Sequence, residues 1–287
     1  MQKTALITGV AGQDGSYLAD FLLKKKYHIV GLTTSLSKQH LYRLAYFNLL
    51  KKITLIKGDV GDGKLMTKII KKYQPDELYN LAGLSSVAKS WGDPAENFRI
   101  NAGAVIELLD CVRTASPHTR FFQASSAEIY GQAKGVITEE TDTFEPIHPY
   151  GVAKLAAHKA VKIFRVHYNL FAVNGILFNH ESPLRDSHFV TKIIARGAAA
   201  IARGSKKKIA LGNLGAKRDF AFAGDVVEAM WRMLQETKPS DFIICTGKTF
   251  SVADVAREAL AAIGIKNWRS CITIVESRKR KHEVRVM

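Results

Sequence analysis

The sequence contains few cysteines. Only three of its 287 residues are cysteines, and Cys111, Cys245 and Cys271 are odd in number and far apart. They form neither a CxxC pair nor a disulfide framework, so we expect no disulfide-stapled fold and no metal site. Reduced, mostly buried thiols are typical of a protein of the cytoplasm, and we expect this location here.

Long hydrophobic runs are also absent. No uninterrupted apolar segment approaches the roughly 20 residues that a membrane-spanning helix needs, so we expect no transmembrane segment. Residues 4–8 already have the pattern of a strand, which leaves no room for the apolar stretch of a signal peptide. Both observations favour a cytoplasmic protein without a membrane partner.

Acidic residues are scarce relative to basic ones. The chain has 26 acidic and 42 basic residues and a net charge of +16. Such a surplus attracts anions, which include nucleic acid, an acidic surface and a diphosphate substrate. Most of the surplus lies in short lysine runs, such as residues 24–26 and 206–208, near expected helix ends or turns. A solvated surface explains such runs better than a nucleic-acid partner.

The remaining pattern is that of an α/β protein. Apolar strands are expected at residues 3–8, 27–32, 53–57, 77–81, 119–124 and 171–178, and helices between them at 13–25, 62–72, 94–114 and 149–167. This alternation predicts a doubly wound, Rossmann-like parallel sheet. The rhythm breaks after residue 178. We expect residues 1–178 plus about 217–246 to bind a dinucleotide, and a smaller, partly interleaved part, 179–216 plus 247–287, to bind the substrate.

A glycine-rich turn follows the first expected strand. Gly9, Gly12 and Gly15 surround the start of the first expected helix, together with Gln13 and Asp14. Glycines at this place allow a tight turn and a close approach of the backbone to a pyrophosphate at the helix N-terminus. Glycines also mark ordinary turns, but a strand before and a helix after favour a dinucleotide site.

Two further strand ends are candidates for cofactor contacts. Asp59 and Val60 follow the third expected strand and suit an adenine contact. Leu81, Ala82 and Gly83 follow the fourth and suit the wall beside a ribose. Each segment is also compatible with a plain strand-end turn, and only their order along the chain favours the cofactor interpretation.

The end of the second expected strand normally decides between NAD and NADP. An acidic residue there binds the ribose 2′-hydroxyl, and an arginine binds a 2′-phosphate. Residues 33–38 contain neither, and Lys38 and Arg43 are the nearest cations. The pattern favours NAD and leaves NADP open.

Tyr150 and Lys154 lie four residues apart on an expected helix and so share one face. A tyrosine that acts near neutral pH must be shifted from a pKa of about 10, which requires about 4 kcal/mol of phenolate stabilisation. One ammonium at about 4 Å supplies roughly that at an effective dielectric of about 20. The pair is also compatible with an ordinary amphipathic helix. Its position in a doubly wound fold favours an acid–base role.

Ser126 and Glu128 follow the fifth expected strand. Oxidation of an alcohol by the phenol and ammonium has no need of a carboxylate, whereas removal of a carbon-bound proton with expulsion of water does. A surface turn carboxylate and a strand-end hydroxyl are the alternative interpretations. The combination with Tyr150 and Lys154 favours a catalytic role.

These motifs together resemble the extended short-chain dehydrogenases and, within them, the GDP-mannose 4,6-dehydratases. The similar segments include residues 6–18, 74–82, 123–131, 149–155, 174–183 and 217–225. The resemblance implies catalytic roles for Ser126, Glu128, Tyr150 and Lys154, and cofactor contacts by His180 and Arg185. It also implies substrate contacts by Ser85, Asn179, Glu181, Lys192, Arg218 and Arg280.

The resemblance implies a function as well. A nucleotide-diphosphate sugar, GDP-mannose or a close GDP-sugar, would lose water to give its 4-keto-6-deoxy derivative, in a homodimer or homotetramer. The family uses NADP and has an arginine pair where this chain has Ser35 and Leu36. Its closing region is expected to be shortened here, which leaves the completeness of the substrate site open.

Two alternatives remain at this point. A nucleotide-sugar epimerase or 4-dehydrogenase would need Ser126, Tyr150 and Lys154 but not Glu128. A non-catalytic dinucleotide sensor or a nucleic-acid-binding protein would need neither the phenol nor the carboxylate. The reaction product distinguishes the first alternative, and a salt-sensitive interaction with DNA or RNA without sugar turnover distinguishes the second.

Overall fold

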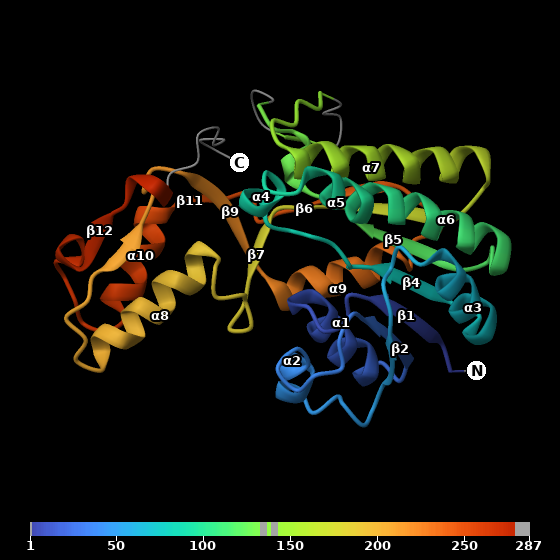
Figure 1. The fold of residues 1–287 in the computed structure, drawn as a ribbon, viewed down its shortest axis with the longest axis horizontal. Helices are drawn as coiled ribbons and strands as arrows, with labels where there is room; N and C mark the ends of the chain where they lie inside the picture. Colours follow the sequence, from blue (N-terminus) through green and yellow to red (C-terminus); the bar gives the residue numbers. More distant parts are fainter. Residues whose placement is uncertain (1, 133–136, 139–142, 279–287) are drawn as a thin grey trace. The chain divides into compact units, whose positions relative to one another are not determined.

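The chain folds into two compact units in the computed structural model, which describes residues 2–132, 137–138 and 143–278. The first unit comprises the described residues of Met1–Leu177 and Ala223–Ile244, and the second those of Phe178–Phe222 and Cys245–Met287. The two units alternate along the sequence, and each has its own strands and helices (Figure 1).

The first unit is built on a parallel seven-stranded sheet with the order β10-β6-β5-β4-β1-β2-β3. Its strands are β1 (Thr4–Thr8), β2 (His28–Thr33), β3 (Thr54–Lys57), β4 (Glu77–Asn80), β5 (Arg120–Ala124), β6 (Ala172–Leu177) and β10 (Asp241–Ile244). The strand order reverses at β1, which has β2 on one side and β4 on the other. The prediction of a doubly wound, Rossmann-like sheet is confirmed.

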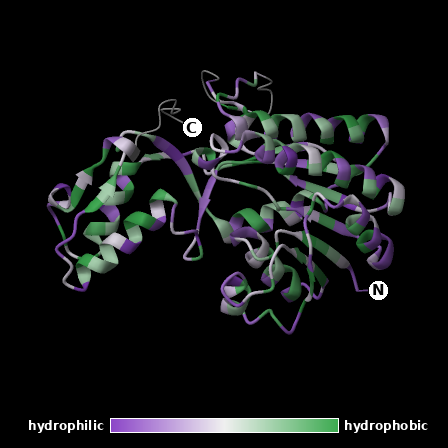
Figure 2. Cartoon of the chain, viewed as in Figure 1, coloured by the Kyte–Doolittle hydropathy of each residue, from purple (hydrophilic) through white to green (hydrophobic). Residues whose placement is uncertain are grey.

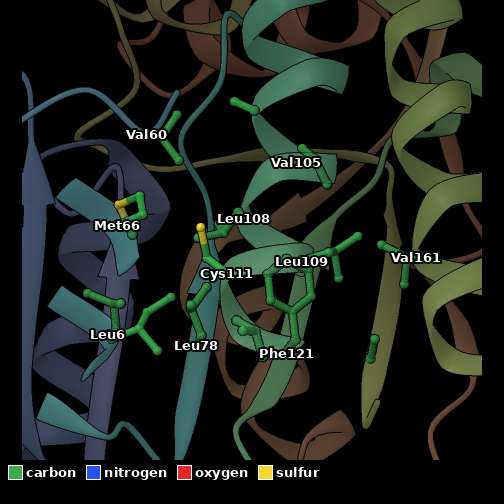
Figure 3. Close-up of a cluster of buried hydrophobic side chains, with 14 of the residues drawn as sticks. Leu6, Val60, Met66, Leu78, Val105, Leu108, Leu109, Cys111, Phe121 and Val161 are labelled. Atoms are coloured by element: carbon green, nitrogen blue, oxygen red, sulfur yellow. The ribbon is translucent and has the colours of Figure 1, made fainter. Parts of the chain in front are cut away.

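Helices flank this sheet. They are α1 (Gln13–Lys24), α2 (Tyr42–Tyr46), α3 (Gly63–Tyr73), α4 (Val87–Ser90), α5 (Pro94–Phe98), α6 (Ala104–Ala115), α7 (Pro149–His167) and α9 (Ala223–Met233). The helix α6 packs between α3 and α7, whereas α1 packs against α9 (Figure 1). Met66 of α3, Leu108 of α6 and Val161 of α7 join Leu6 and Phe121 of the sheet in one buried hydrophobic cluster (Figure 3).

The prediction of one continuous helix at residues 94–114 is wrong, because the segment contains a change of helix type. A π-helical turn, Arg99–Gly103, separates α5 from α6. Asn101 lies in this turn, where its side-chain oxygen accepts a hydrogen bond from the Leu84 N–H and its amide nitrogen donates to the Leu84 carbonyl. The π-helical turn therefore connects the start of α6 to the loop after β4 through hydrogen bonds. The spacing of apolar residues in the sequence could not predict this connection.

The second unit contains β7 (Asn179–Glu181), α8 (Val190–Ala202), β8 (Ile209–Leu211), β9 (Lys217–Phe222), β11 (Thr249–Ser251), α10 (Val252–Ala261) and β12 (Ile272–Ile274). Its sheets have the orders β11-β9-β7 and β12-β8. A hydrophobic core that includes Ile194 of α8, Leu260 of α10 and Trp268 supports it. Figure 2 shows that β7 and the start of β9 are hydrophilic, unlike the buried strands of the first unit.

The boundary expected at residue 217 is corrected by the structure. Residues 217–222 were expected with the dinucleotide-binding part, but they form β9, which pairs with β7 and β11 of the second unit. The first unit resumes only at Ala223, where α9 begins. The strand's own pattern gave no sign of its pairing partners, because pairing is decided by distant segments.

The parallel sheet brings the candidate segments of the first unit to one edge. All parallel strands end on the same side, so the segments after β1, β4 and β5 follow one another along that edge. Ligands of doubly wound sheets bind at this edge, where the strand order reverses. None of the described helices is both long and apolar enough to span a membrane.

Candidate active site

The glycine turn connects β1 tightly to α1. Gly9 has a left-handed φ of 69°, and a Cβ there would lie 2.8 Å from the Ala82 backbone nitrogen. A Cβ on Gly15 would lie 2.4 Å from the Gly9 carbonyl oxygen. Gly12 caps α1 without a side-chain hydrogen bond and is exposed. The turn thus presents bare backbone at a helix N-terminus, which suits a pyrophosphate.

The neighbouring residues of this turn are held in place by local hydrogen bonds. The Gln13 amide donates to the Asp14 carboxylate at 3.0 Å. Ala82, which lies against Gly9, donates its backbone N–H to Thr8 Oγ1. The segment after β4 therefore packs directly against the end of β1 and the glycine turn.

The segment after β3 is more polar. The Asp59 carboxylate accepts a hydrogen bond from the Gly61 N–H at 2.7 Å and lies 3.6 Å from the Arg99 guanidinium. Val60 is buried in the core of the first unit. Asp59 is therefore oriented by its own turn, while Val60 fixes that turn to the sheet.

The segment after β2 carries no acidic side chain. Ser35 is half-buried, and Leu36 and Lys38 are exposed. Arg43 is buried on α2, and its guanidinium donates to the Ala11 carbonyl of the glycine turn at 3.4 Å. Of the two cations nearest to the end of β2, Lys38 is therefore exposed to solvent and Arg43 is packed beside the glycine turn.

A chain of buried hydrogen bonds, absent from the sequence analysis, crosses the sheet at its carboxyl edge. Thr8 Oγ1 donates to Asn80 Oδ1 at 2.6 Å, and Asn80 Nδ2 donates to Gln123 Oε1 at 2.8 Å. Gln123 then donates to the Ala124 carbonyl, which also accepts a hydrogen bond from Lys154 Nζ at 2.8 Å. Because these groups are buried and bonded, they fix β1, β4 and β5 in relation to Lys154.

Ser126 and Glu128 lie on one 3-10 turn, η2 (Ala127–Ile129), directly after β5. Ser126 caps this turn, since its Oγ accepts a hydrogen bond from the Glu128 N–H at 3.3 Å. Ser126 is buried, and the Glu128 side chain is 16 % exposed. The hydroxyl and the carboxylate are therefore near neighbours in a mostly water-excluded place.

The helix α7 carries the phenol and the ammonium. Pro149 occupies the first helical turn, where the missing N–H costs nothing. Tyr150 and Lys154 are both buried, and Lys154 Nζ lies 5.8 Å from the centre of the Tyr150 ring. Burial lowers the pKa of Lys154 from 10.5 to about 8, because the charged ammonium is poorly solvated there. Gly83 lies beside the same ammonium, since a Cβ on it would be 3.7 Å from Nζ.

His148 is a site residue that the sequence analysis missed. It caps α7 by accepting a hydrogen bond from the Gly151 N–H at Nδ1, 2.9 Å away. Its other nitrogen, Nε2, lies 2.9 Å from Glu128 Oε2. A cap position directly before a proline was the available signal, but histidine is not among the usual capping residues, so the pattern did not stand out.

The second unit carries the candidate residues after β6. His180 Nδ1 hydrogen-bonds to the Phe178 carbonyl at 2.8 Å and is buried. Glu181 accepts a hydrogen bond from Thr191 Oγ1 at 2.6 Å and lies 3.2 Å from Arg185 Nε. The structure thus pairs Glu181 with Arg185, whereas His180 is bonded to the backbone of its own strand end.

The other predicted substrate residues belong to separate elements. Lys192 on α8 donates to the Pro183 carbonyl. Asn179 pairs with Phe220 in the β7–β9 ladder, and Arg218 is buried on β9. In the first unit, Ser85 is exposed in the loop before α4. Arg280 lies outside the described residues.

Residues 6–287 match the family model described as GDP-mannose 4,6 dehydratase. The chain belongs to the GDP-mannose 4,6-dehydratase family. It is 42 % identical to a GDP-mannose 4,6 dehydratase of Cricetulus griseus over 99 % of this chain and 76 % of that protein. A GDP-mannose 4,6-dehydratase of Vibrio cholerae is 41 % identical over 92 % of this chain and 73 % of the relative.

Solved structures share the fold of this family member. A UDP-glucose 4-epimerase of Thermotoga maritima, crystallised with UDP-glucose, has a TM-score of 0.85 and 24 % identity over 99 % of this chain and 88 % of that one. A dTDP-glucose 4,6-dehydratase of Bacillus anthracis in complex with NAD also has a TM-score of 0.85, with 21 % identity over 99 % and 86 % of the two chains. At such identities the likeness concerns the fold.

In this GDP-mannose 4,6-dehydratase family member, the four residues predicted to be catalytic lie in two pairs. Ser126 meets Glu128 through the turn after β5, and Tyr150 and Lys154 share one side of α7. His148 joins the two groups. The site therefore contains a carboxylate, a phenol and an ammonium within one unit of the chain.

Proposed function

We propose that this chain removes water from GDP-mannose, or from a close GDP-sugar, to give the 4-keto-6-deoxy derivative. Family membership supports the reaction class. The observation that carries the proposal is the Glu128 carboxylate, held at the start of the helix that bears Tyr150. An epimerase or a plain 4-dehydrogenase has no use for a carboxylate there.

Tyr150 acts first in the proposed reaction. Its phenolate removes the proton of the sugar 4-hydroxyl, which allows oxidation at C4. Lys154 supports the phenolate, because an ammonium in a buried setting stabilises a neighbouring negative charge more strongly than it does in water. Although burial lowers the pKa of Lys154 to about 8, this value is still above neutral pH, so most of the lysine side chains remain charged there.

Glu128 acts second. The new 4-ketone acidifies the proton on C5. The carboxylate removes that proton and passes it to the C6 hydroxyl, which leaves as water. Ser126 accepts the Glu128 N–H, so its own hydroxyl hydrogen can point to the ketone oxygen and polarise it. A proton returns to C5 when the hydride reaches C6, and it balances the proton that Tyr150 removed from the 4-hydroxyl. The net change is loss of one water, with no net oxidation.

The residues present fit a nicotinamide dinucleotide. A Cβ on Gly9 or Gly15 would collide with backbone, and this close turn leaves the N-terminus of α1 open to a pyrophosphate. We propose that Gly9, Gly12, Gln13, Asp14 and Gly15 hold the diphosphate. Asp59 and Val60 would contact the adenine, and residues 81–83 would line the ribose. A bound nicotinamide would supply the acceptor for the C4 hydride and the donor of that hydride to C6.

NAD is the proposed cofactor, in preference to NADP. Ser35 and Leu36 stand where an arginine pair would bind a 2′-phosphate, and Lys38 is exposed. Arg43 is engaged with the Ala11 carbonyl. These residues provide no obvious pair of donors for a second phosphate.

Binding roles are also proposed for residues of the second unit. His180 and Arg185 would bind the cofactor, while Asn179, Glu181, Lys192 and Arg218 would bind the nucleotide sugar, together with Ser85 of the first unit and Arg280. The basic members of this set suit a diphosphate, because guanidinium and ammonium groups form charge-assisted hydrogen bonds to phosphate oxygens.

A homo-oligomer, dimer or tetramer, is proposed as the working form. Val152, Ile163 and Val166 share one exposed side of α7 and are each about half exposed or more. Apolar side chains gathered in this way favour burial against a second copy. Light scattering of the purified protein tests the stoichiometry. The cytoplasmic location stays a prediction.

Incubation of the purified protein with GDP-mannose and either oxidised cofactor tests the function. We expect a product lighter by one water, with a 6-methyl signal in its proton spectrum. A product of unchanged mass would favour an epimerase, and accumulation of reduced cofactor without water loss would favour a 4-dehydrogenase.

A further inference from the structure

We infer that His148 is a positioning residue that fixes the Glu128 carboxylate to the helix carrying Tyr150. This inference rests on the proposed function, in which Glu128 removes the C5 proton. The base and the phenol belong to different elements, η2 and α7. His148 bridges the two elements through both of its ring nitrogens.

The two hydrogen bonds determine where the imidazole proton lies. The Gly151 N–H donates to Nδ1 at 2.9 Å, so Nδ1 must be the unprotonated nitrogen. The proton of the neutral ring is then on Nε2, which faces Glu128 Oε2 at 2.9 Å. His148 therefore donates a hydrogen bond to the carboxylate while it accepts one from the helix.

Capping alone does not explain a histidine at this place. A helix N-terminus needs only a hydrogen-bond acceptor, and the smaller side chains of serine, asparagine and aspartate supply one. The additional nitrogen of His148 reaches the carboxylate, and both side chains are largely shielded from water, with 3 % and 16 % exposed. In such a setting water competes weakly for the hydrogen bond.

The backbone supports the same connection. A Cβ on Gly151 would lie 2.8 Å from the Glu128 carbonyl oxygen, so the glycine lets the start of α7 approach the turn that bears Glu128. The His148 ring also lies nearly parallel to the Tyr150 ring, with centroids 6.1 Å apart. His148 thus relates the carboxylate to the phenol, which must act on neighbouring carbons of one sugar ring.

Two substitutions separate the two hydrogen bonds. In His148→Asn, the shorter amide has an acceptor near the position of Nδ1 and keeps the cap, but it does not reach Glu128. In His148→Gln, the longer amide places a donor near the position of Nε2 and loses the cap. A capping role and a positioning role therefore predict opposite results for this matched pair.

The experiment follows single turnovers of GDP-mannose in deuterated water. It records reduced cofactor by absorbance and deuterium at C5 by mass spectrometry, with thermal midpoints for all variants. We expect His148→Asn to keep its midpoint and its rate of cofactor reduction, to lose about ten- to a hundredfold in dehydration, and to accumulate reduced cofactor. His148→Gln should retain most of the dehydration at a lower midpoint.

Wild-type dehydration and cofactor reduction in His148→Asn would overturn the inference and leave the proposed function intact. Absence of water loss in the wild-type protein would instead overturn the proposed function. Nitrogen NMR of the histidine side chains tests the inference without substrate. The signals of His148 are identified by their absence in His148→Asn. We expect a neutral His148 with its proton on Nε2, and a proton on Nδ1 would contradict the bridge.

Discussion

Glu128 and His148 lie 2.9 Å apart, Oε2 to Nε2, although twenty residues separate them in the sequence. The contact joins the turn after β5 to the first turn of α7. It places a carboxylate beside the start of a helix whose first two turns carry Tyr150 and Lys154. The site can therefore combine oxidation of an alcohol with removal of a neighbouring carbon-bound proton.

Replacement of Glu128 by glutamine should separate the two half-reactions. The amide keeps the size of the side chain but is not a base, so Glu128→Gln should still reduce cofactor with GDP-mannose while dehydration falls by at least about a hundredfold. Stopped-flow absorbance and product mass measure the two steps. Glu236→Gln, an exposed carboxylate in the same unit, serves as the control and should behave as wild type. Full turnover by Glu128→Gln would refute the assigned base.

Lys154 should make stability depend on pH in a defined window. Its pKa is about 8 in the folded protein and 10.5 when solvated, because of burial. Below pH 8 both states bind the proton, and the cost of the buried charge is fully present. Between pH 8 and 10.5 only the unfolded state keeps the proton, so stability rises with pH.

Denaturant titrations of wild type and Lys154→Met across this window measure the effect. The wild type should gain about 3 kcal/mol relative to the variant as the pH rises through it. Lys162→Met, an exposed lysine on the same helix, should show the wild-type slope. Parallel curves for wild type and Lys154→Met would contradict the burial of the ammonium. The same variant should lose cofactor reduction.

Gly15 should not tolerate a side chain. A Cβ would lie 2.4 Å from the Gly9 carbonyl oxygen and 2.6 Å from the Val10 Cα, both backbone atoms with little freedom to move. Gly15→Ala should lower stability by about 1–3 kcal/mol and weaken cofactor binding. Gly103→Ala, where a Cβ meets nothing within 4 Å, should leave both unchanged. Calorimetric unfolding and cofactor titration give the two values, and equal behaviour of the variants would contradict the close turn.

The cofactor choice should respond to Ser35. The wild-type protein is expected to bind NAD more tightly than NADP, since residues 33–38 carry no arginine. Ser35→Arg adds a planar cation beside the 2′-position and should shift the ratio of dissociation constants toward NADP by about tenfold. Ser35→Gln is a control of similar reach without the charge. A wild-type preference for NADP would show that Arg43 or another cation binds the phosphate.

The sequence predicted the parallel sheet, and the placement of Tyr150 and Lys154 on one side of a helix, for physical reasons. Buried strands such as β1 and β6 are mostly apolar, and the glycine turn has a strand before it and a helix after it. Tyr150 and Lys154 are four residues apart on one helix, so local spacing alone puts them on one side. Such features can be predicted from the sequence because they depend only on residues that are close together along the chain.

Other features depend on pairings that no local pattern encodes. The Thr8–Asn80–Gln123 chain exists only because β1, β4 and β5 are neighbours in the sheet. β9 joins the second unit because it pairs with β7. His148 became recognisable only when its second nitrogen was seen to meet Glu128.

Transfer of a deuterium label within one sugar tests the central claim most directly. GDP-mannose deuterated at C4 is incubated with the wild-type protein and oxidised cofactor, and the product is measured by mass spectrometry and NMR. The joint action of Tyr150 and Glu128 predicts loss of one water, with the deuterium moved to C6. A product that keeps the mass of the substrate, or that loses its deuterium without loss of water, would contradict the dehydratase assignment.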